Sequence, residues 1–262
     1  MPEATIIGQR IRYDVRPGSG IPLVLLCGIG ASYEVLQPLV DALDPSLEVV
    51  RLDVPGVGGS PAGPLPYGFP VLAWMVDKLL GRLEYGTVDV LGLSWGGGLA
   101  QQLALQHPRR VRRLVLVSTA TGMLMVPGRP SVLRRMATPR RFRDPTYAAG
   151  MAAYLYGGSA RHHAPDIRRM FGEQVAGGSL RGYLHQLATG ACWTSLPFLP
   201  FIRQRTLVMA GDDDPIVPLV NGRILARLIP NAGLHVFPGG HVELVTEAAS
   251  LAPVVSTFLL EG

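Results

Sequence analysis

The sequence has little that would suit a disordered or membrane-spanning protein. Only 16% of its 262 residues are charged and 48% are hydrophobic, which excludes a disordered chain and supplies enough apolar side chains for a full core. No apolar run reaches the roughly 18 residues that a membrane span requires. The first 16 residues lack a basic start followed by an apolar core, so we expect no signal peptide.

Cysteine and lysine are also scarce. The two cysteines, Cys27 and Cys192, lie far apart and predict no disulfide framework, which favours a reduced, cytoplasmic protein. Lys78 is the only lysine, so the formal net charge of +5 comes from arginine. Arginine clusters without interleaved aromatic residues are typical of a solvated surface, and we therefore expect no nucleic-acid partner.

Patterns of strand and helix alternate along the first 120 residues. After an opening hairpin over Ile6–Val15, continuous apolar runs predict buried strands at 21–27, 47–53, 87–93 and 111–117. Helical spacing of apolar residues between these runs predicts helices at 34–43, 71–83 and 95–106. The sequence therefore predicts an α/β fold with a mostly parallel central sheet and helices on both faces.

The alternation stops between residues 121 and 200, which contain no buried strand run. This stretch is rich in Arg, Met, Tyr, Gly and Pro and indicates several short helices. Strands resume at 205–210 and 233–237 around a helix at 219–228, and a closing helix from about 242 to 260 is expected to be interrupted near Pro253. We predict a core of residues 1–120 and 201–262, with residues 121–200 inserted after the sixth strand as a helical lid.

A strand, a glycine-rich turn and a helix meet at Gly92-Leu93-Ser94-Trp95-Gly96. The pattern Gly-x-Ser-x-Gly in this context is the nucleophile elbow of α/β-hydrolases, in which a strained turn exposes the serine hydroxyl. In a chain with 32 glycines the bare motif is weak, because an incidental serine in such a turn is common. The surrounding chain must decide whether Ser94 is a nucleophile.

Two later positions supply what a serine nucleophile needs. Serine requires a nearby base, and the base requires an orienting carboxylate. Asp214 follows the strand at 205–210, and His241 follows the final strand, in the order serine, acid, histidine that α/β-hydrolases use. We predict a catalytic triad of Ser94, Asp214 and His241, with Asp213 as the alternative acid.

Backbone amides are expected to stabilise the oxyanion of acyl transfer. The N–H of Trp95 lies at the start of a helix, and that of Ile29 lies in the loop after the strand at 21–27. No cofactor or metal is expected. The glycine-rich turns at 28–30 and 56–59 complete neither G-x-G-x-x-G nor G-x-x-x-x-G-K-[ST], which excludes nucleotide binding.

An ester of an apolar acid needs an apolar channel, and the lid offers side chains to line one. The predicted substrate-binding residues are Met125, Tyr156 and Trp193, and further candidates are Met123, Leu124, Tyr154, Leu155 and Tyr183. A second interpretation is that these residues pack the lid against the core.

Several segments of the core and the lid resemble the intracellular medium-chain-length polyhydroxyalkanoate depolymerases, within the α/β-hydrolase superfamily. The similar segments are residues 54–60, 94–102, 125–128, 156–158, 193–195 and 210–215. The resemblance implies hydrolysis of a stored polyester of 3-hydroxy fatty acids, with Ser94, Asp214 and His241 at matching positions. It also implies location at cytoplasmic storage granules. Cys27 departs from the family, whose members carry other polar residues there.

Other functions share these residues. A small-molecule carboxylesterase, a lactonase or a C–C bond hydrolase would use the same triad, and a non-catalytic binding module can adopt the same fold. The sequence leaves chain-length preference, exo- or endo-cleavage and oligomeric state open.

Overall fold

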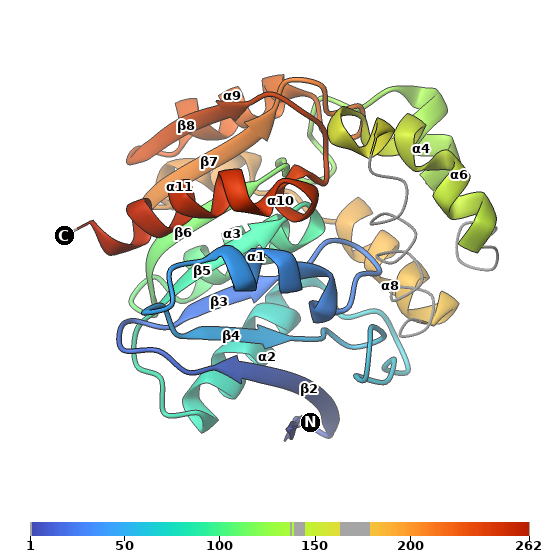
Figure 1. The fold of residues 1–262 in the computed structure, drawn as a ribbon. Coiled ribbons are helices and arrows are strands. Elements are labelled where there is room, and N and C mark those ends of the chain that lie inside the picture. Colours follow the sequence, from blue (N-terminus) through green and yellow to red (C-terminus); the bar gives the residue numbers. More distant parts are fainter. Residues whose placement is uncertain (1, 137, 139–144, 163–178, 262) are drawn as a thin grey trace.

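The computed structural model describes residues 2–136, 138, 145–162 and 179–261. One eight-stranded sheet crosses the molecule in the spatial order β1-β2-β4-β3-β5-β6-β7-β8 (Figure 1). Its strands are β1 (Glu3–Ile6), β2 (Gln9–Arg16), β3 (Leu23–Leu26), β4 (Val49–Leu52), β5 (Val88–Leu93), β6 (Val111–Val117), β7 (Arg205–Gly211) and β8 (Ala232–Phe237). The mostly parallel α/β sheet that the sequence predicts is confirmed.

Only the N-terminal edge of the sheet is antiparallel. β1 and β2 form the expected opening hairpin, and β2 then pairs antiparallel with β4. The pairs from β4 through β3, β5, β6 and β7 to β8 are all parallel. Because parallel strands end at the same edge, the loops after β3, β5, β7 and β8 gather on one side of the sheet.

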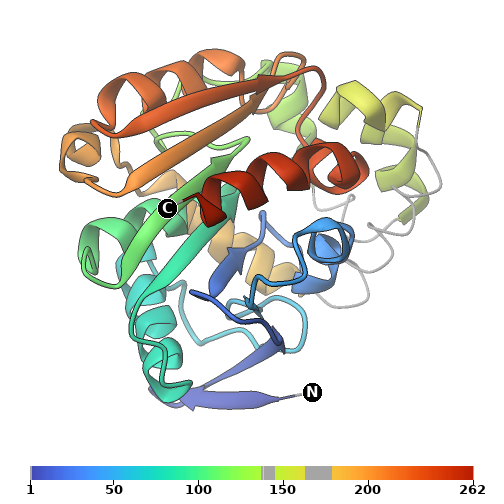
Figure 2. The ribbon, with the colours of Figure 1, turned by 60° about the vertical axis from the view of Figure 1, so that its left-hand side comes forward.

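Helices cover both faces of this sheet (Figures 1 and 2). Alternate residues of β3 show why: Val24 and Leu26 pack into one apolar cluster, whereas Leu23 and Leu25 pack into another. The first cluster includes helices α2 (Phe69–Arg82), α3 (Trp95–Gln106) and α9 (Leu219–Leu228); the second includes α1 (Gln37–Ala42), the preceding 3₁₀ turn η1 (Tyr33–Leu36), α10 (Glu243–Thr246) and α11 (Ala248–Leu260).

The closing helix is interrupted, but the predicted place was wrong. The break lies at Glu247, between α10 and α11, whereas Pro253 sits inside α11. Glu247 leaves the helical region with φ −121° and ψ 35°. Pro253 is exposed, so its ring faces solvent and the helix continues past it.

The segment between β6 and β7 is helical in its described residues. It contains α4 (Pro130–Met136), α6 (Pro145–Tyr156), the 3₁₀ turn η2 (Gly158–Arg161), α8 (Leu180–Ala191) and the 3₁₀ turn η3 (Leu196–Phe201). Its two ends are tied together, since Met123 N–H donates to Trp193 O at 2.8 Å and Ser195 N–H donates to Thr121 O at 3.1 Å. The segment therefore leaves and re-enters the sheet domain through one short antiparallel stem, and we call it the insertion.

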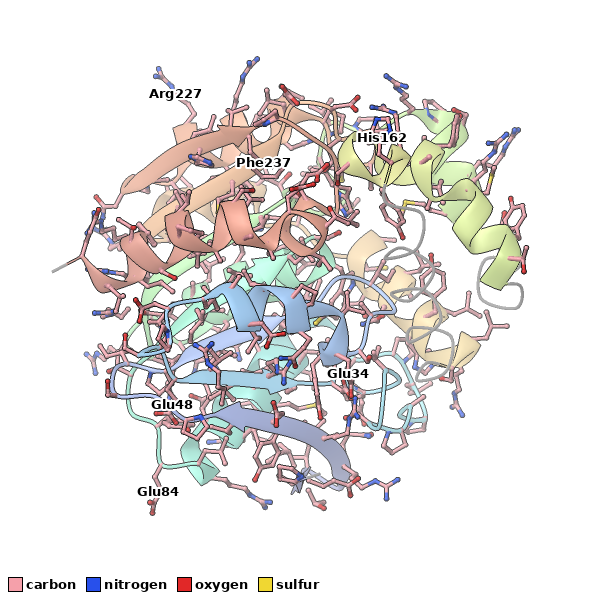
Figure 3. The ribbon with its side chains drawn as sticks, in the orientation of Figure 1. Glu34, Glu48, Glu84, His162, Arg227 and Phe237 are labelled. Atoms are coloured by element: carbon pink, nitrogen blue, oxygen red, sulfur yellow. The ribbon has the colours of Figure 1, made fainter. Side chains whose placement is uncertain are left out.

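Charged side chains lie mainly on the outside of the molecule. In Figure 3, Arg227 of α9 and Glu84 after α2 project away from the body, whereas Phe237 of β8 lies within it. In the described part of the chain, no helix is both long and apolar enough to cross a membrane.

Candidate active site

Ser94 lies in a tight turn between β5 and α3. Its φ of +54° with ψ of −117° is in a region that non-glycine residues rarely adopt. Neither flanking glycine could carry a side chain: a Cβ on Gly92 would lie closer than 3.0 Å to the Gly96 backbone, and one on Gly96 would approach Leu26 O as closely. The two glycines let α3 pass close to the sheet, which leaves Ser94 at the carboxyl end of β5.

The structure brings together the three residues predicted as a triad. His241 Nε2 lies 2.8 Å from Ser94 Oγ, and His241 Nδ1 lies 2.7 Å from Asp214 Oδ2. The other carboxylate oxygen of Asp214 accepts the N–H groups of Ile216 and Val217, each at 2.9 Å. His241 and Asp214 are both buried, so this hydrogen-bonded chain is largely shielded from water.

Asp213, the alternative acid, points elsewhere. Its carboxylate forms an ion pair with Arg161 and accepts the Gly158 N–H at 2.9 Å. The hydrogen bond from Arg161 lowers the pKa of the Asp213 carboxyl. Asp213 thus joins the insertion to the loop after β7, and Asp214 is the acid that reaches His241.

The loop that carries His241 is held by the insertion and by Glu243. His241 N–H donates to Tyr156 O at 2.7 Å. The Glu243 carboxylate is buried, and it accepts the N–H groups of Gly240 and Ser159, each at 2.7 Å. Sequence reasoning missed Glu243, because a single glutamate at a helix start carries no signal of such a contact.

The two predicted oxyanion donors flank Ser94. Trp95 is the first residue of α3, where a backbone N–H has no intrahelical acceptor. Ile29 lines the same two cavities as Ser94. Within the described residues, no hydrogen bond occupies the N–H of Ile29 or that of Trp95.

Gln186 of α8 links these two donor segments, and sequence reasoning missed it. Its side-chain Oε1 accepts the Gly30 N–H at 2.6 Å, and its backbone carbonyl accepts the Trp95 indole N–H at 2.9 Å. The insertion therefore contacts both the loop after β3 and the residue after Ser94. A lone glutamine on an amphipathic helix gives no hint of this role.

Ser94 lines two cavities. The larger has a volume of about 550 Å³ and is lined mainly by apolar residues, among them Phe69, Met125, Trp193 and Ile216. The smaller, about 40 Å³, is lined by Tyr156 and His241 as well as Ser94. The predicted substrate-binding residues thus divide, with Met125 and Trp193 in the large cavity and Tyr156 in the small one.

Of the further lining candidates, Met123 lies in the wall of the large cavity. Leu155 and Tyr183 are almost wholly buried in the packing of the insertion, and the Tyr183 hydroxyl donates to Met136 O at 2.7 Å. Leu124 and Tyr154 are exposed. The interpretation that these residues pack the lid against the core holds for Leu155, because it joins an apolar cluster that contains Val132 of the insertion together with Ala31 and Ile216 of the sheet domain.

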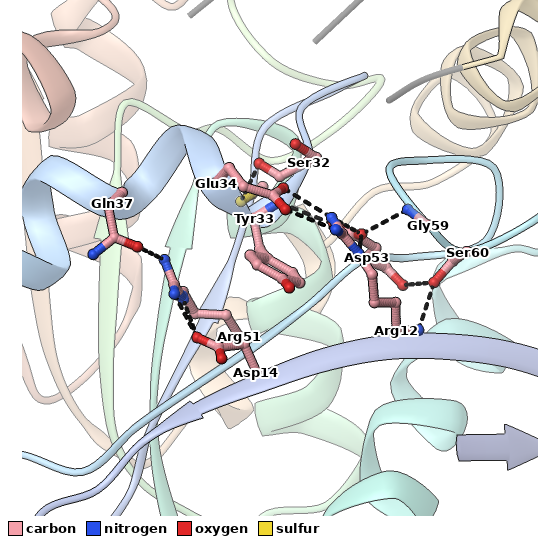
Figure 4. Close-up of polar contacts among 11 residues, drawn as sticks. Arg12, Asp14, Ser32, Tyr33, Glu34, Gln37, Arg51, Asp53, Gly59 and Ser60 are labelled. Atoms are coloured by element: carbon pink, nitrogen blue, oxygen red, sulfur yellow. Dashed lines mark hydrogen bonds and ion pairs between the residues drawn. The ribbon is translucent and has the colours of Figure 1, made fainter. Parts of the chain in front are cut away.

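A charged network supports the loop after β3 from behind (Figure 4). Asp53, at the end of β4, accepts the Tyr33 N–H at 2.9 Å and the Gly59 N–H at 3.0 Å. Arg12 of β2 forms ion pairs with Asp53 at 2.5 Å and Glu34 at 2.7 Å. The network therefore anchors the far end of the loop that presents Ile29.

Replacing Asp53 with asparagine should destabilise the protein by about 3 kcal/mol, because the partly buried guanidinium of Arg12 loses its fully buried partner and keeps only the more exposed Glu34. Urea unfolding measures this. Asp14→Asn is the matched control: Asp14 pairs with Arg51 on the other side of the Tyr33 ring but is 35% exposed, so its loss should cost less than about 1 kcal/mol. Equal stability losses in the two variants would contradict the role given to Asp53.

Cys27 precedes the loop and has no reactive character. Its Sγ donates to Ser32 O at 3.6 Å. Burial, followed by the nearby charge of Asp53, raises the pKa of the Cys27 thiol. The thiolate is therefore disfavoured at neutral pH, and the residue serves as a small packing group.

Iodoacetamide at pH 8 should alkylate Cys192, which is exposed, at least about tenfold faster than Cys27. Mass spectrometry of tryptic peptides measures both rates. In Cys192→Ser the rapid phase should vanish, whereas fast alkylation of Cys27 in the folded enzyme would show that its thiol is accessible and ionised.

Within the described residues, no three His, Cys, Asp or Glu side chains are grouped so that they could hold a metal ion.

Comparison with known proteins agrees with the fold. A model of the α/β-hydrolase fold matches residues 21–248, and the chain belongs to this family. A poly(3-hydroxyalkanoate) depolymerase of Ectopseudomonas oleovorans is 48% identical over 96% of this chain and 89% of its own length.

More distant relatives carry other activities on the same fold. A 2-hydroxymuconate semialdehyde hydrolase of Pseudomonas sp. (strain CF600) is 32% identical over 98% of this chain and 93% of its own length. The crystal structure of the enol-lactonase from Burkholderia xenovorans LB400 matches with a TM-score of 0.87 at 26% identity, covering 99% of this chain and all of the lactonase chain.

Proposed function

We propose that this chain is a serine hydrolase that cleaves the ester bonds of a stored medium-chain-length poly(3-hydroxyalkanoate), releasing 3-hydroxy fatty acids or oligomers. The observation that carries the proposal is the hydrogen-bonded chain Ser94–His241–Asp214 at the wall of a large apolar cavity. The similarity to the Ectopseudomonas depolymerase supports the choice of polyester.

The mechanism follows from the geometry. His241 Nε2 takes the proton of Ser94 Oγ as that oxygen attacks the ester carbonyl carbon, and the N–H groups of Ile29 and Trp95 bind the resulting oxyanion. Asp214 holds the Nδ1–H of His241 and stabilises the imidazolium. His241 then protonates the departing alkoxide of the polymer chain, and water releases the acyl group from Ser94 by the same steps.

The lining of the large cavity favours a neutral, apolar acyl chain. None of its described lining residues carries a charged side chain. A substrate with a carboxylate, such as a semialdehyde of a dicarboxylic acid, would find no counter-charge among these described residues. This argues for an aliphatic ester over the C–C bond hydrolase alternative.

The insertion acts in this proposal as a lid, and its exposed apolar residues contact the polymer surface. Met123, Leu124 and Val126 are 60%, 52% and 41% exposed, and they adjoin Met125 in the cavity wall. An exposed apolar strip beside a substrate cavity suits adsorption to a hydrophobic particle. We place the enzyme at polyester storage granules inside the cell on this ground.

The test is to incubate the enzyme with suspensions of a medium-chain and of a short-chain poly(3-hydroxyalkanoate), and to identify the soluble products by mass spectrometry. Release of 3-hydroxy fatty acids or their oligomers from the medium-chain polymer is expected, together with pelleting of the protein on it. Turnover of soluble p-nitrophenyl esters without attack on either polymer would instead indicate a small-molecule esterase or lactonase.

A further inference from the structure

Among the described side chains that line the large cavity, one has a donor that is left without a hydrogen-bond partner, apart from Ser94 itself. The polar side chains of the described lining are those of Ser94, Trp95, Thr119, Gln186 and Trp193. The remaining donors are occupied: the Trp95 indole binds Gln186 O, Thr119 Oγ1 binds Ser94 O, and the Trp193 indole binds Gln102 Oε1.

Gln186 differs from these. Gln186 is only 3% exposed, and its Nε2 atom is buried with no hydrogen-bond partner among the described residues. The amide orientation is determined by chemistry, because the atom facing the Gly30 N–H at 2.6 Å must be the acceptor oxygen. The nitrogen is therefore the free atom. A buried amide N–H without an acceptor is unfavourable and marks a place for one.

The position of Gln186 limits which substrate oxygen can fill that place. Gln186 contacts Gly30, beside the oxyanion donor Ile29, and Trp95, the other oxyanion donor. When a substrate carbonyl lies at the site, its oxygen accepts the N–H groups of Ile29 and Trp95 and is therefore not available to Gln186. The next oxygen along a 3-hydroxyacyl group is on carbon 3, three covalent bonds from the carbonyl carbon.

We propose that Gln186 Nε2 donates a hydrogen bond to the oxygen on carbon 3 of the acyl group, and so selects 3-hydroxyacyl esters over plain fatty acyl esters. In the polymer this oxygen is the ester oxygen of the adjoining repeat unit, and in an end unit it is a hydroxyl; both accept a hydrogen bond. A plain fatty acyl group has a methylene there and would leave the buried amide unpaired. This inference rests on the proposed ester hydrolysis at Ser94 and specifies its substrate class.

The experiment compares kcat/KM for p-nitrophenyl 3-hydroxyoctanoate, 3-methoxyoctanoate and octanoate, each corrected for its rate of spontaneous hydrolysis. The 3-methoxy ester mimics the polymer, since its oxygen accepts a hydrogen bond and cannot donate one. The unaltered enzyme should favour both oxygenated esters about tenfold over octanoate, which corresponds to one hydrogen bond. The preference should disappear in Gln186→Leu and in the length-matched Gln186→Met.

The ratio between substrates separates this role from a structural one. Removing the side chain also removes the acceptor of the Gly30 N–H, which should slow all three esters alike and leave their ratio unaffected. Leu187→Ala, a change in the same helix and the same cavity wall without a hydrogen-bonding group, should keep the preference. Circular dichroism and thermal unfolding show whether each variant is folded, and Gln186→Met replaces Gln186→Leu if the latter is not.

A tenfold preference that survives in the folded Gln186 variants would overturn the inference, as would an unaltered enzyme with no preference. Both results would leave ester hydrolysis at Ser94 intact. Absence of turnover for all three esters and for the polymer would instead refute the proposed function, and this inference with it.

Discussion

Ser94→Ala is expected to lower kcat for ester hydrolysis by about 10⁶-fold, to the residual rate that the oxyanion donors and the cavity can support. The Ser94 hydroxyl lies 2.8 Å from His241 Nε2, where it can lose its proton as it attacks a carbonyl carbon. The substitution removes only the hydroxyl of Ser94, which belongs to the site and not to the apolar core. The midpoint temperature of thermal unfolding should therefore change little. The measurement is p-nitrophenyl ester turnover together with polymer degradation.

A fluorophosphonate probe gives an independent readout of the same residue. It should label Ser94 in the unaltered enzyme and fail to label Ser94→Ala. Ser250→Ala is a matched control, because Ser250 is an exposed serine on α11. Failure to label the unaltered enzyme would favour the non-catalytic binding module, and turnover retained in Ser94→Ala would reject Ser94 as the nucleophile.

Asp214→Asn should reduce kcat by about 10⁴-fold, the second largest effect. The amide oxygen of asparagine can still accept the Ile216 and Val217 N–H groups, which preserves the turn. The amide cannot hold the Nδ1–H tautomer of His241 and also balance the positive charge that forms during catalysis.

The neighbouring Asp213 offers the matched control. Asp213→Asn removes the ion pair with Arg161. The side chain of Arg161 is 48% exposed and that of Asp213 is 39% exposed, so this change should alter kcat by less than about threefold. Steady-state kinetics of the two variants on one soluble ester decide the matter. A larger loss in Asp213→Asn than in Asp214→Asn would reverse the assignment of the acid.

The local patterns of the sequence were sufficient for the fold. The continuous apolar run of β3, which is buried along its whole length, and the helical spacing of apolar residues in α2 are properties of neighbouring residues in the sequence, so they can be recognised without tertiary information. The helices α3 and α9 begin and end where the sequence predicts. The predicted interruption of the closing helix was misplaced because the sequence shows that a proline disfavours a helix interior but does not show its surroundings. Pro253 lies on the exposed side of α11, and the helix continues past it.

Ser94, Asp214 and His241 were also predictable, because each follows a strand whose carboxyl end must lie at one edge of a parallel sheet. Gln186, Glu243 and the Arg12–Asp53 pair were not, since they join segments 156, 84 and 41 residues apart. Their hydrogen bonds depend on how the insertion packs on the sheet domain and on how separate strands and loops meet. The sequence by itself determined which residues are candidates for the triad, because each follows a strand. Tertiary packing decided which of two adjacent aspartates reaches His241 and left the buried amide of Gln186 without an acceptor, because both depend on contacts between distant segments.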